Sequence, residues 1–195
     1  MLAFSDLQAG IVADLVRASV DVHVFNQRDI AGILAMIRTL GALVGAAERA
    51  EGLARDLERR LAEMAATPRP SARPKVYFEE WDDPLISGIG WVSELIEIAG
   101  GQDVFQELRH RQAAKDRIVS AEAVREAAPD VILASWCGKK VVPARIRARD
   151  CWNEIPAVRD DRIVEIKSPI VLQPGPAALT DGLDAIVTAL WGGLK

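Results

Sequence analysis

The sequence has few of the residue types that build metal and redox centres. Its 195 residues include two histidines, His23 and His110, and two cysteines, Cys137 and Cys151, with no Cys-x-x-Cys pair. We therefore expect neither a histidine-rich zinc or haem-iron site nor another metal site formed by the chain itself. The cysteines are either small, partly buried thiols or one disulfide that closes a short loop in an oxidising compartment.

Other absences exclude whole classes of function. Lys and Arg number 24 against 28 Asp and Glu, and this net charge of −4 argues against a nucleic-acid partner. No apolar run approaches the roughly 20 residues of a membrane-spanning helix. The first residues, MLAFSDLQAG, do not show the basic segment and apolar stretch of a secretory signal. The Gly-x-Ser-x-Gly, Walker and dinucleotide-binding patterns are also missing.

What the sequence does contain is a long amphipathic stretch from Gly45 to Pro74, GAAERAEGLARDLERRLAEMAA followed by TPRPSARP. Its apolar residues recur at steps of three and four: Ala50, Leu53, Leu57, Leu61 and Met64. Glu and Arg fill the gaps, so the pattern predicts one long helix with a narrow apolar stripe. A helix of about 20 residues spans roughly 30 Å, enough to connect two halves of a protein as a rigid spine.

Before the spine, the sequence predicts a short β-α-β-α unit. Residues 2–5 and 20–25 read as strands, and Asp6 and Asp29 are placed to cap the two helices. Two strands are too few for a stable parallel sheet, so we expect an incomplete N-terminal lobe. Either the chain starts in the middle of a domain, or another copy of the chain covers the open edge.

After the spine the α/β pattern is fuller. Strands are expected at residues 75–80, 130–135 and 162–166, and helices between them, which predicts a parallel sheet with right-handed crossovers. The chain then divides into a partial N-terminal lobe (1–45), a spine helix with a Pro-rich linker (46–74) and a C-terminal lobe (75–195).

The loops that follow these three strands are the expected ligand-binding edge, because α/β sheets bind ligands beyond the carboxyl ends of their strands. Trp81 and Trp136 each lie just past a strand end, and we interpret them as a shared binding wall. Trp152 and Trp191 lie outside these loops and are interpreted as packing residues. The acidic run from Glu79 to Asp83 is interpreted first as polar lining or helix capping. A hydrolase that uses Glu79 or Glu80 with Asp82 is the alternative.

Several segments, taken in order, resemble one family. KVYFEEWDDPLISGIGWVSELIEIAGGQDVF, DRIVSAEAVREAAPDVILASWCGK and IPAVRDDRIVEI are similar to the C-terminal lobe of class III substrate-binding proteins of ABC importers. The resemblance extends through the spine to residues 2–45. It implies two Rossmann-like α/β lobes with parallel sheets, joined by a rigid helix, that grip a ligand such as cobalamin (vitamin B12), an iron–siderophore or haem. It also implies transport in the periplasm, with no catalysis and no covalent cofactor.

The resemblance also assigns roles by position. An acidic residue of this lobe docks onto the ABC transporter permease, and Glu122 matches that position. The aromatic wall favours cobalamin or a related metal chelate. The ligand-binding set is Trp81, Trp91, Trp136 and Glu80 in the cleft, with Arg117, Ser168 and Gln173 at its rim. The alternative function is a truncated, non-transporting lobe that self-associates, as a homodimer, through the open edge of its N-terminal sheet.

Overall fold

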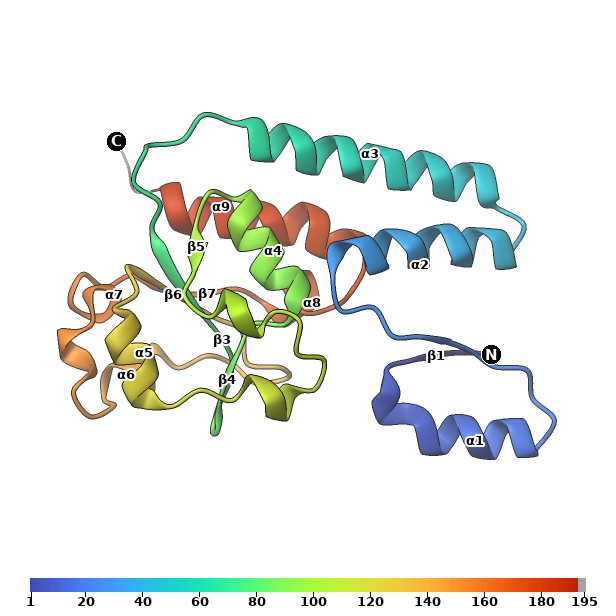
Figure 1. Cartoon of the computed structure of the whole chain (residues 1–195), viewed down its shortest axis with the longest axis horizontal. Coiled ribbons are helices and arrows are strands. Elements are labelled where there is room, and N and C mark those ends of the chain that lie inside the picture. Colours follow the sequence, from blue (N-terminus) through green and yellow to red (C-terminus); the bar gives the residue numbers. More distant parts are fainter. Residues whose placement is uncertain (193–195) are drawn as a thin grey trace.

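The N-terminal region forms a small, open unit in the computed structural model, which describes residues 1–192. Strand β1 (Leu2–Phe4) pairs in parallel with β2 (His23–Phe25), and α1 (Ala9–Arg17) connects them. None of the residues of α1 is buried. Figure 1 shows this unit standing apart from the larger sheet, at one end of an elongated molecule. The predicted strands and helix are confirmed, and so is the small size of the N-terminal sheet. The expected cap is wrong: Ser5, and not Asp6, accepts the Leu7 N–H at the start of the first turn, and α1 itself has no side-chain cap.

Two long helices follow and pack against each other as a hairpin. Helix α2 (Ile30–Leu43) starts at Asp29, whose carboxylate accepts the Gly32 N–H at 2.7 Å, and α3 (Ala47–Ala66) is the predicted spine. The turn between them places Gly45 at a φ of +72°, a conformation that favours glycine. The spine is therefore not a solitary strut: it lies along α2 and also contacts helices of the C-terminal region (Figure 1).

Close backbone approach and an ion network hold this hairpin together. A Cβ on Gly41 would lie only 2.1 Å from the Cβ of Ala50, so only glycine allows the two helices to come this near. Arg38 donates to Glu51 at 2.7 Å and to Glu58 at 3.0 Å, both on α3. These half-exposed pairs fix the rotation of one helix on the other more than they add stability.

The C-terminal region is built on a mixed sheet with strand order β4-β3-β6-β7, and β5 also pairs with β3. Strands β3 (Lys75–Asp82), β6 (Val131–Ala134) and β7 (Ile163–Glu165) run parallel, as predicted, and the two-residue strand β5 (Gln102–Asp103), which was not predicted, runs parallel to β3. Strand β4 (Leu85–Ser87), which the sequence pattern does not predict, turns back antiparallel to β3. The remaining helices are α4 (Gly90–Ile98), α5 (Ala121–Ala127), α6 (Pro143–Arg147), α7 (Pro156–Arg159), α8 (Ser168–Val171) and α9 (Leu183–Trp191).

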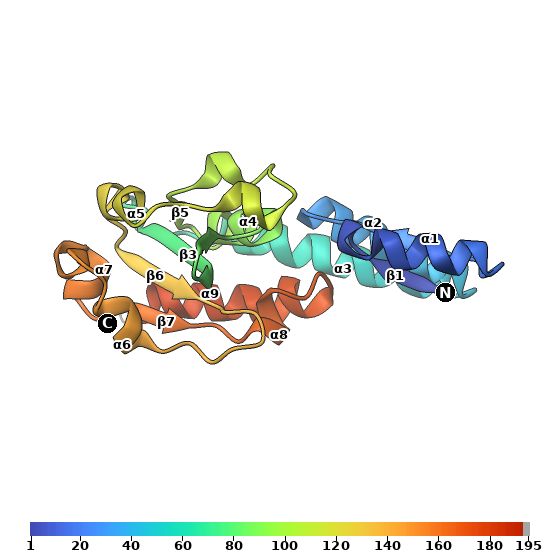
Figure 2. The ribbon, with the colours of Figure 1, turned by 90° about the horizontal axis from the view of Figure 1, so that it is seen from below.

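The sheet separates two hydrophobic cores. Val76 and Phe78 of β3 point into a core shared with α2, α3, α4 and α9, whereas Tyr77 points into a second core with Trp136 and Trp152. This alternation follows from the two-residue period of a strand. Figure 2 shows α9 and α3 along one side of the sheet, with α5, α6 and α7 gathered at the far end. The first core crosses the expected domain limits at residues 45 and 74.

The start of α4 joins the two halves of the molecule. The backbone N–H of Trp91 donates to the Arg28 carbonyl at 3.0 Å, and the backbone N–H of Ile30 donates to the Glu94 carboxylate at 2.7 Å. Burial raises the pKa of Glu94, against the effect of that hydrogen bond from Ile30. A Cβ on Gly90 would lie 2.4 Å from the Arg28 carbonyl oxygen, so this joint depends on glycine. Within the described residues, no helix is long and apolar enough to cross a membrane.

Candidate functional site

The candidate site lies where β3, β6 and β7 end at the same edge of the sheet. Because these strands are parallel, the segments that follow Asp82, Ala134 and Glu165 leave the sheet at the same edge, and Trp81 lies within the last residues of β3 and not past its end. Trp81 is half-buried and donates its indole N–H to the Asp83 carbonyl at 2.9 Å. This bond fixes the ring at the tip of the β3–β4 hairpin, where one part of it stays accessible.

Around Trp81 the structure assembles a cluster of one buried acid and two exposed bases. Asp82, whose side chain is 2% exposed, contacts Lys139 at 2.5 Å and Arg145 at 3.2 Å. The Lys139 ammonium also lies 3.8 Å from the centre of the Trp81 ring. Burial disfavours the ionised form of Asp82, but the hydrogen bond from Lys139 and both positive charges outweigh it and lower its pKa. We call Trp81, Asp82, Lys139 and Arg145 the strand-end cluster.

Beneath this cluster, a fully buried carboxylate positions Trp136. Glu79 is 0% exposed and accepts hydrogen bonds from Arg149 at 2.5 and 2.9 Å and from the Trp136 indole at 2.9 Å. Trp136 itself is only 1% exposed. It therefore packs under the site and does not form an exposed cleft wall, which differs from the sequence-based expectation.

A second buried ion pair occupies the other face of β3. Glu80 accepts from Arg117 at 2.8 and 3.0 Å and from the Ile89 N–H at 3.0 Å. Arg117 is 1% exposed and also donates to the Ser87 carbonyl. These contacts tie the loop before α5 and the start of α4 to β3. Arg117, expected at the rim of the cleft, is thus inside the fold, and Glu80 is engaged with it.

Trp91 also differs from the expectation. It is 2% exposed, belongs to the core on the side of α2 and α3, and donates its indole N–H to the Val171 carbonyl at 2.8 Å. Trp136 belongs to the core on the opposite face of the sheet, so the two rings cannot form one wall. The predicted rim residues Ser168 and Gln173 lie at and just after α8, half-buried and exposed respectively, at the carboxyl end of β7.

Three of the four carboxylates of the acidic run have basic partners, and the fourth, Asp83, forms no ion pair among the described residues. Glu79 binds Arg149, Glu80 binds Arg117, and Asp82 binds Lys139 and Arg145. No two of these acids share a site in the way that acid–base hydrolysis requires. The part of the chain that the structure describes also contains no group of three or more His, Cys, Asp or Glu placed to hold a metal ion. Cys137 and Cys151 are free and exposed.

Lys139 and Arg145 are the site residues that the sequence analysis did not single out. The signal for them was the basic run KKVVPARIRAR directly after the β6 loop. Its partner, Asp82, lies 57 residues away, so the sequence alone did not connect the two. Glu122 lies exposed in the first turn of α5, whose N-cap Ser120 accepts the Ala123 N–H at 3.1 Å.

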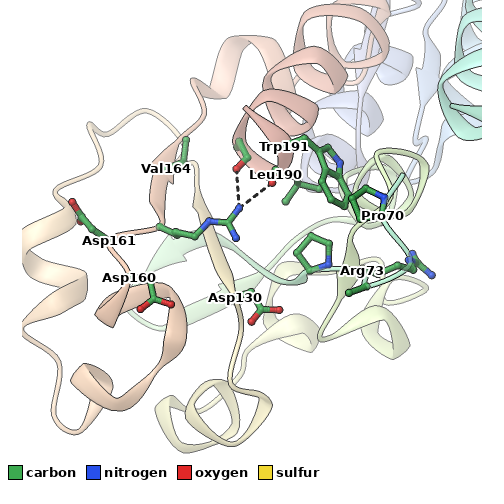
Figure 3. A pocket seen from close by; sticks show the side chains of 12 residues that line it. Pro70, Arg73, Asp130, Asp160, Asp161, Val164, Leu190 and Trp191 are labelled. Carbon is green, nitrogen blue, oxygen red and sulfur yellow. Dashed lines mark hydrogen bonds between the residues drawn. The ribbon is translucent and has the colours of Figure 1, made fainter. Parts of the chain in front are cut away.

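Two cavities lie elsewhere. The larger, about 750 Å³, lies at the amino ends of the strands, where Arg162 donates to the Ala189 and Leu190 carbonyls beside Trp191 (Figure 3). The smaller, about 450 Å³, lies between the N-terminal strands and the end of α2. The strand-end cluster lines neither of these two cavities.

Comparison with known proteins gives one family. A family model described as "periplasmic binding protein" matches residues 2–170. No curated protein sequence matches the chain. Among solved structures, an ABC transporter substrate-binding protein from Listeria monocytogenes is 19% identical, with a TM-score of 0.80 over 98% of this chain and 76% of that one.

Two further structures have named ligands. The periplasmic haem-binding protein RhuT from Roseiflexus is 23% identical, with a TM-score of 0.72 over 92% of this chain and 71% of that chain. The periplasmic vitamin B12-binding protein BtuF of Vibrio cholerae is 20% identical, with a TM-score of 0.69 over 97% of this chain and 73% of that chain. At these identities the likeness shows a shared fold.

Proposed function

Because the chain belongs to the periplasmic binding protein family, we propose that it is the substrate-binding component of an ABC import system. Its ligand is cobalamin or a related metal chelate, held between the lobes at the carboxyl edge of the larger sheet. The observation that carries this proposal is the strand-end cluster, where an accessible tryptophan lies beside two exposed bases. The named relatives bind haem and vitamin B12, both of which contain a metal held in a broad macrocycle.

The direct contacts are assigned to Trp81, with Ser168 and Gln173 at the rim. An aromatic ring offers a flat macrocycle a wide apolar contact at a small cost in conformational entropy. Glu79 and Trp136 support the site from below, and the buried pair of Glu80 and Arg117 fixes the hairpin that carries Trp81. A site held by buried ion pairs is rigid, which suits ligand capture without large hinge motion.

The role is binding and not catalysis. The carboxylates nearest the site are held by bases, so they are not free to act as a general acid and base pair. The interactions that the strand-end cluster provides to a ligand are aromatic contact and ionic attraction. The ligand therefore leaves the site unchanged, as import requires.

The partner is the permease of an ABC transporter in an extracytoplasmic compartment, the periplasm. Glu122, exposed on α5, is assigned to dock onto basic residues of that permease. The Glu122→Arg variant should lose stimulation of transporter ATPase activity, with ligand affinity unchanged. Glu126→Arg, exposed on the same helix, is the matched control. Equal stimulation by both variants would remove the assignment.

Quenching of tryptophan fluorescence tests ligand capture. Cobalamin and haem should each be titrated into the protein, together with a non-binding dye of similar absorbance as the optical control. Trp81→Ala should weaken binding about tenfold or more, the usual effect of removing an aromatic anchor. Trp191→Phe, in the cavity at the opposite edge, should leave it unchanged. If neither chelate binds at micromolar concentration, the transport proposal fails.

The second candidate is a self-associating module, favoured by the distribution of exposed apolar side chains. Among residues 1–192 most of the large ones lie before residue 45: Met1, Leu2, Phe4, Leu7, Ile11, Val16, Val24, Leu43 and Val44. Such a surface, next to an open sheet edge, suits pairing of two copies. Light scattering distinguishes the cases: a dimer that Ile11→Glu dissociates supports self-association, and a monomer at all concentrations contradicts it.

A further inference from the structure

The strand-end cluster carries more positive than negative charge. One carboxylate, that of Asp82, serves two bases, since Lys139 contacts its Oδ1 and Arg145 its Oδ2. The acid is buried, whereas the side chains of Lys139 and Arg145 are 40% and 61% exposed. A single negative charge cannot neutralise both bases, and the exposed neighbour Asp83 forms no ion pair with either among the described residues, so Lys139 and Arg145 carry positive charge that Asp82 alone does not balance.

The contact between Arg145 and Asp82 is an ion pair without a hydrogen bond, so the guanidinium N–H groups of Arg145 remain able to donate hydrogen bonds to a ligand. The two groups lie 3.2 Å apart, yet in the described structure Asp82 Oδ2 accepts no hydrogen bond. The guanidinium therefore has N–H groups that point elsewhere. By contrast, Arg149 and Arg117 each make paired hydrogen bonds to a buried carboxylate. Of these arginines, Arg145 is the most exposed and the least engaged.

The two bases also lie against aromatic rings. Lys139 lies 3.8 Å from the centre of Trp81 and 5.8 Å from that of Trp136, and the Arg145 guanidinium carbon is 5.5 Å from the centre of Trp136. Cation–π contacts of this kind hold the charged groups in place beside an apolar surface. The cluster thus combines an apolar patch with fixed cations, in a protein whose overall net charge is −4.

We propose that Lys139 and Arg145 recognise a carboxylate at the edge of the bound chelate, so that the site selects anionic chelates over neutral ones. The proposal rests on the proposed function. A carboxylate received between the two bases completes the charge balance that Asp82 leaves open, through charge-assisted hydrogen bonds from both. The flat body of the same ligand then lies against Trp81. A chelate whose periphery carries only amides or esters makes the aromatic contact without the ionic one.

A matched pair of porphyrins tests this. Iron protoporphyrin IX carries two propionate groups, and its dimethyl ester has the same ring and metal without the charges. Binding of both is measured in one water–dimethyl sulfoxide mixture by the change in the porphyrin absorption band. The native protein should prefer the dicarboxylate by about tenfold or more, as expected for a charge-assisted contact. The preference should shrink as salt is added.

Three variants identify the residues responsible. Asp82→Asn leaves both bases without their internal partner and should increase the preference for the dicarboxylate. Asp82→Asn combined with Lys139→Gln and Arg145→Gln leaves no unpaired buried charge and should abolish the preference, which is measured as the ratio of the two affinities within the same variant. Arg147→Gln, an exposed arginine on the same helix as Arg145, is the control and should keep the preference.

The outcomes separate the two proposals. Equal affinity of the native protein for the acid and the ester would overturn carboxylate recognition and leave chelate capture standing. A preference that survives the triple variant would also overturn it, because the charge would then come from elsewhere. If neither porphyrin nor cobalamin binds, the proposed function and this inference fall together.

Discussion

Removal of the Arg149 side-chain charge should destabilise the protein severely, because its partner Glu79 is fully buried. Glu79 is 0% exposed, and Arg149 supplies two of the hydrogen bonds that its carboxylate accepts, at 2.5 and 2.9 Å. Arg149→Met keeps part of the apolar stem but removes the guanidinium, whose carbon lies 4.5 Å from the centre of the Trp152 ring, and an uncompensated carboxylate stays in the core. Loss of one partner of a buried ion pair costs about 3–5 kcal/mol. That is a large part of the stability of an ordinary domain.

The measurement is the free energy of unfolding from urea titration, followed by tryptophan emission and circular dichroism. Arg159→Met is the matched control, since Arg159 pairs with Asp160 at the surface, where both side chains are more than half exposed. Its cost should stay within about 1 kcal/mol. Glu79→Gln combined with Arg149→Met should recover much of the loss, because the buried charge is gone and the amide oxygen still accepts from Trp136.

This reasoning would be refuted if Arg149→Met cost no more than Arg159→Met. It would also be refuted if the double variant were less stable than Arg149→Met alone, since the damage would then lie in lost packing and not in the orphaned charge.

Two further predictions concern the joint and the β5 edge. Gly90→Ala should cost about 1–3 kcal/mol in urea unfolding, the usual effect of forcing extra atoms into a packed site, because the new Cβ meets the Arg28 carbonyl at 2.4 Å; Gly52→Ala, where a Cβ meets nothing, should cost nothing. Burial raises the pKa of Asp103 in the folded protein above its unfolded value of about 3.9. The protonated side chain therefore favours the folded state below that pH, and this contribution to the free energy of unfolding is lost as pH rises through the folded pKa. Asp103→Asn should therefore become more stable relative to the native protein as pH increases, and a constant difference across the pH range would contradict this.

Much of the fold follows from local patterns in the sequence. The caps at Asp29 and Ser120 and the apolar runs of β3 and β6 are signals within one element, and the structure confirms them. The stripe of the α3 spine is confirmed at Ala50, Leu57 and Leu61, but Leu53 is 41% exposed and Ala54 is buried instead. Strand β4 escaped prediction because it is three residues long and is defined by its pairing with β3. The contact of α3 with α2 likewise depends on two glycines whose role is visible only in three dimensions.

The candidate site was harder to predict, because its residues are defined by distant partners. A tryptophan near the carboxyl end of a strand has the same sequence context whether it is half-buried, as Trp81 is within β3, or fully buried, as Trp136 is after β6. Arg117 was expected at the rim of the cleft, but its partner Glu80 lies 37 residues earlier and draws it into the fold. Burial of charge depends on such long-range pairs, which one sequence does not reveal.

Oxidative footprinting of the tryptophans tests the central claim most directly. The native protein would be exposed to hydroxyl radicals with and without cobalamin or haem, and modification at each tryptophan measured by mass spectrometry. The account predicts that the chelate protects Trp81 and leaves Trp191, half-buried at the opposite edge of the sheet, as reactive as before. Protection of Trp191 with no change at Trp81 would contradict a binding site at the carboxyl ends of the strands.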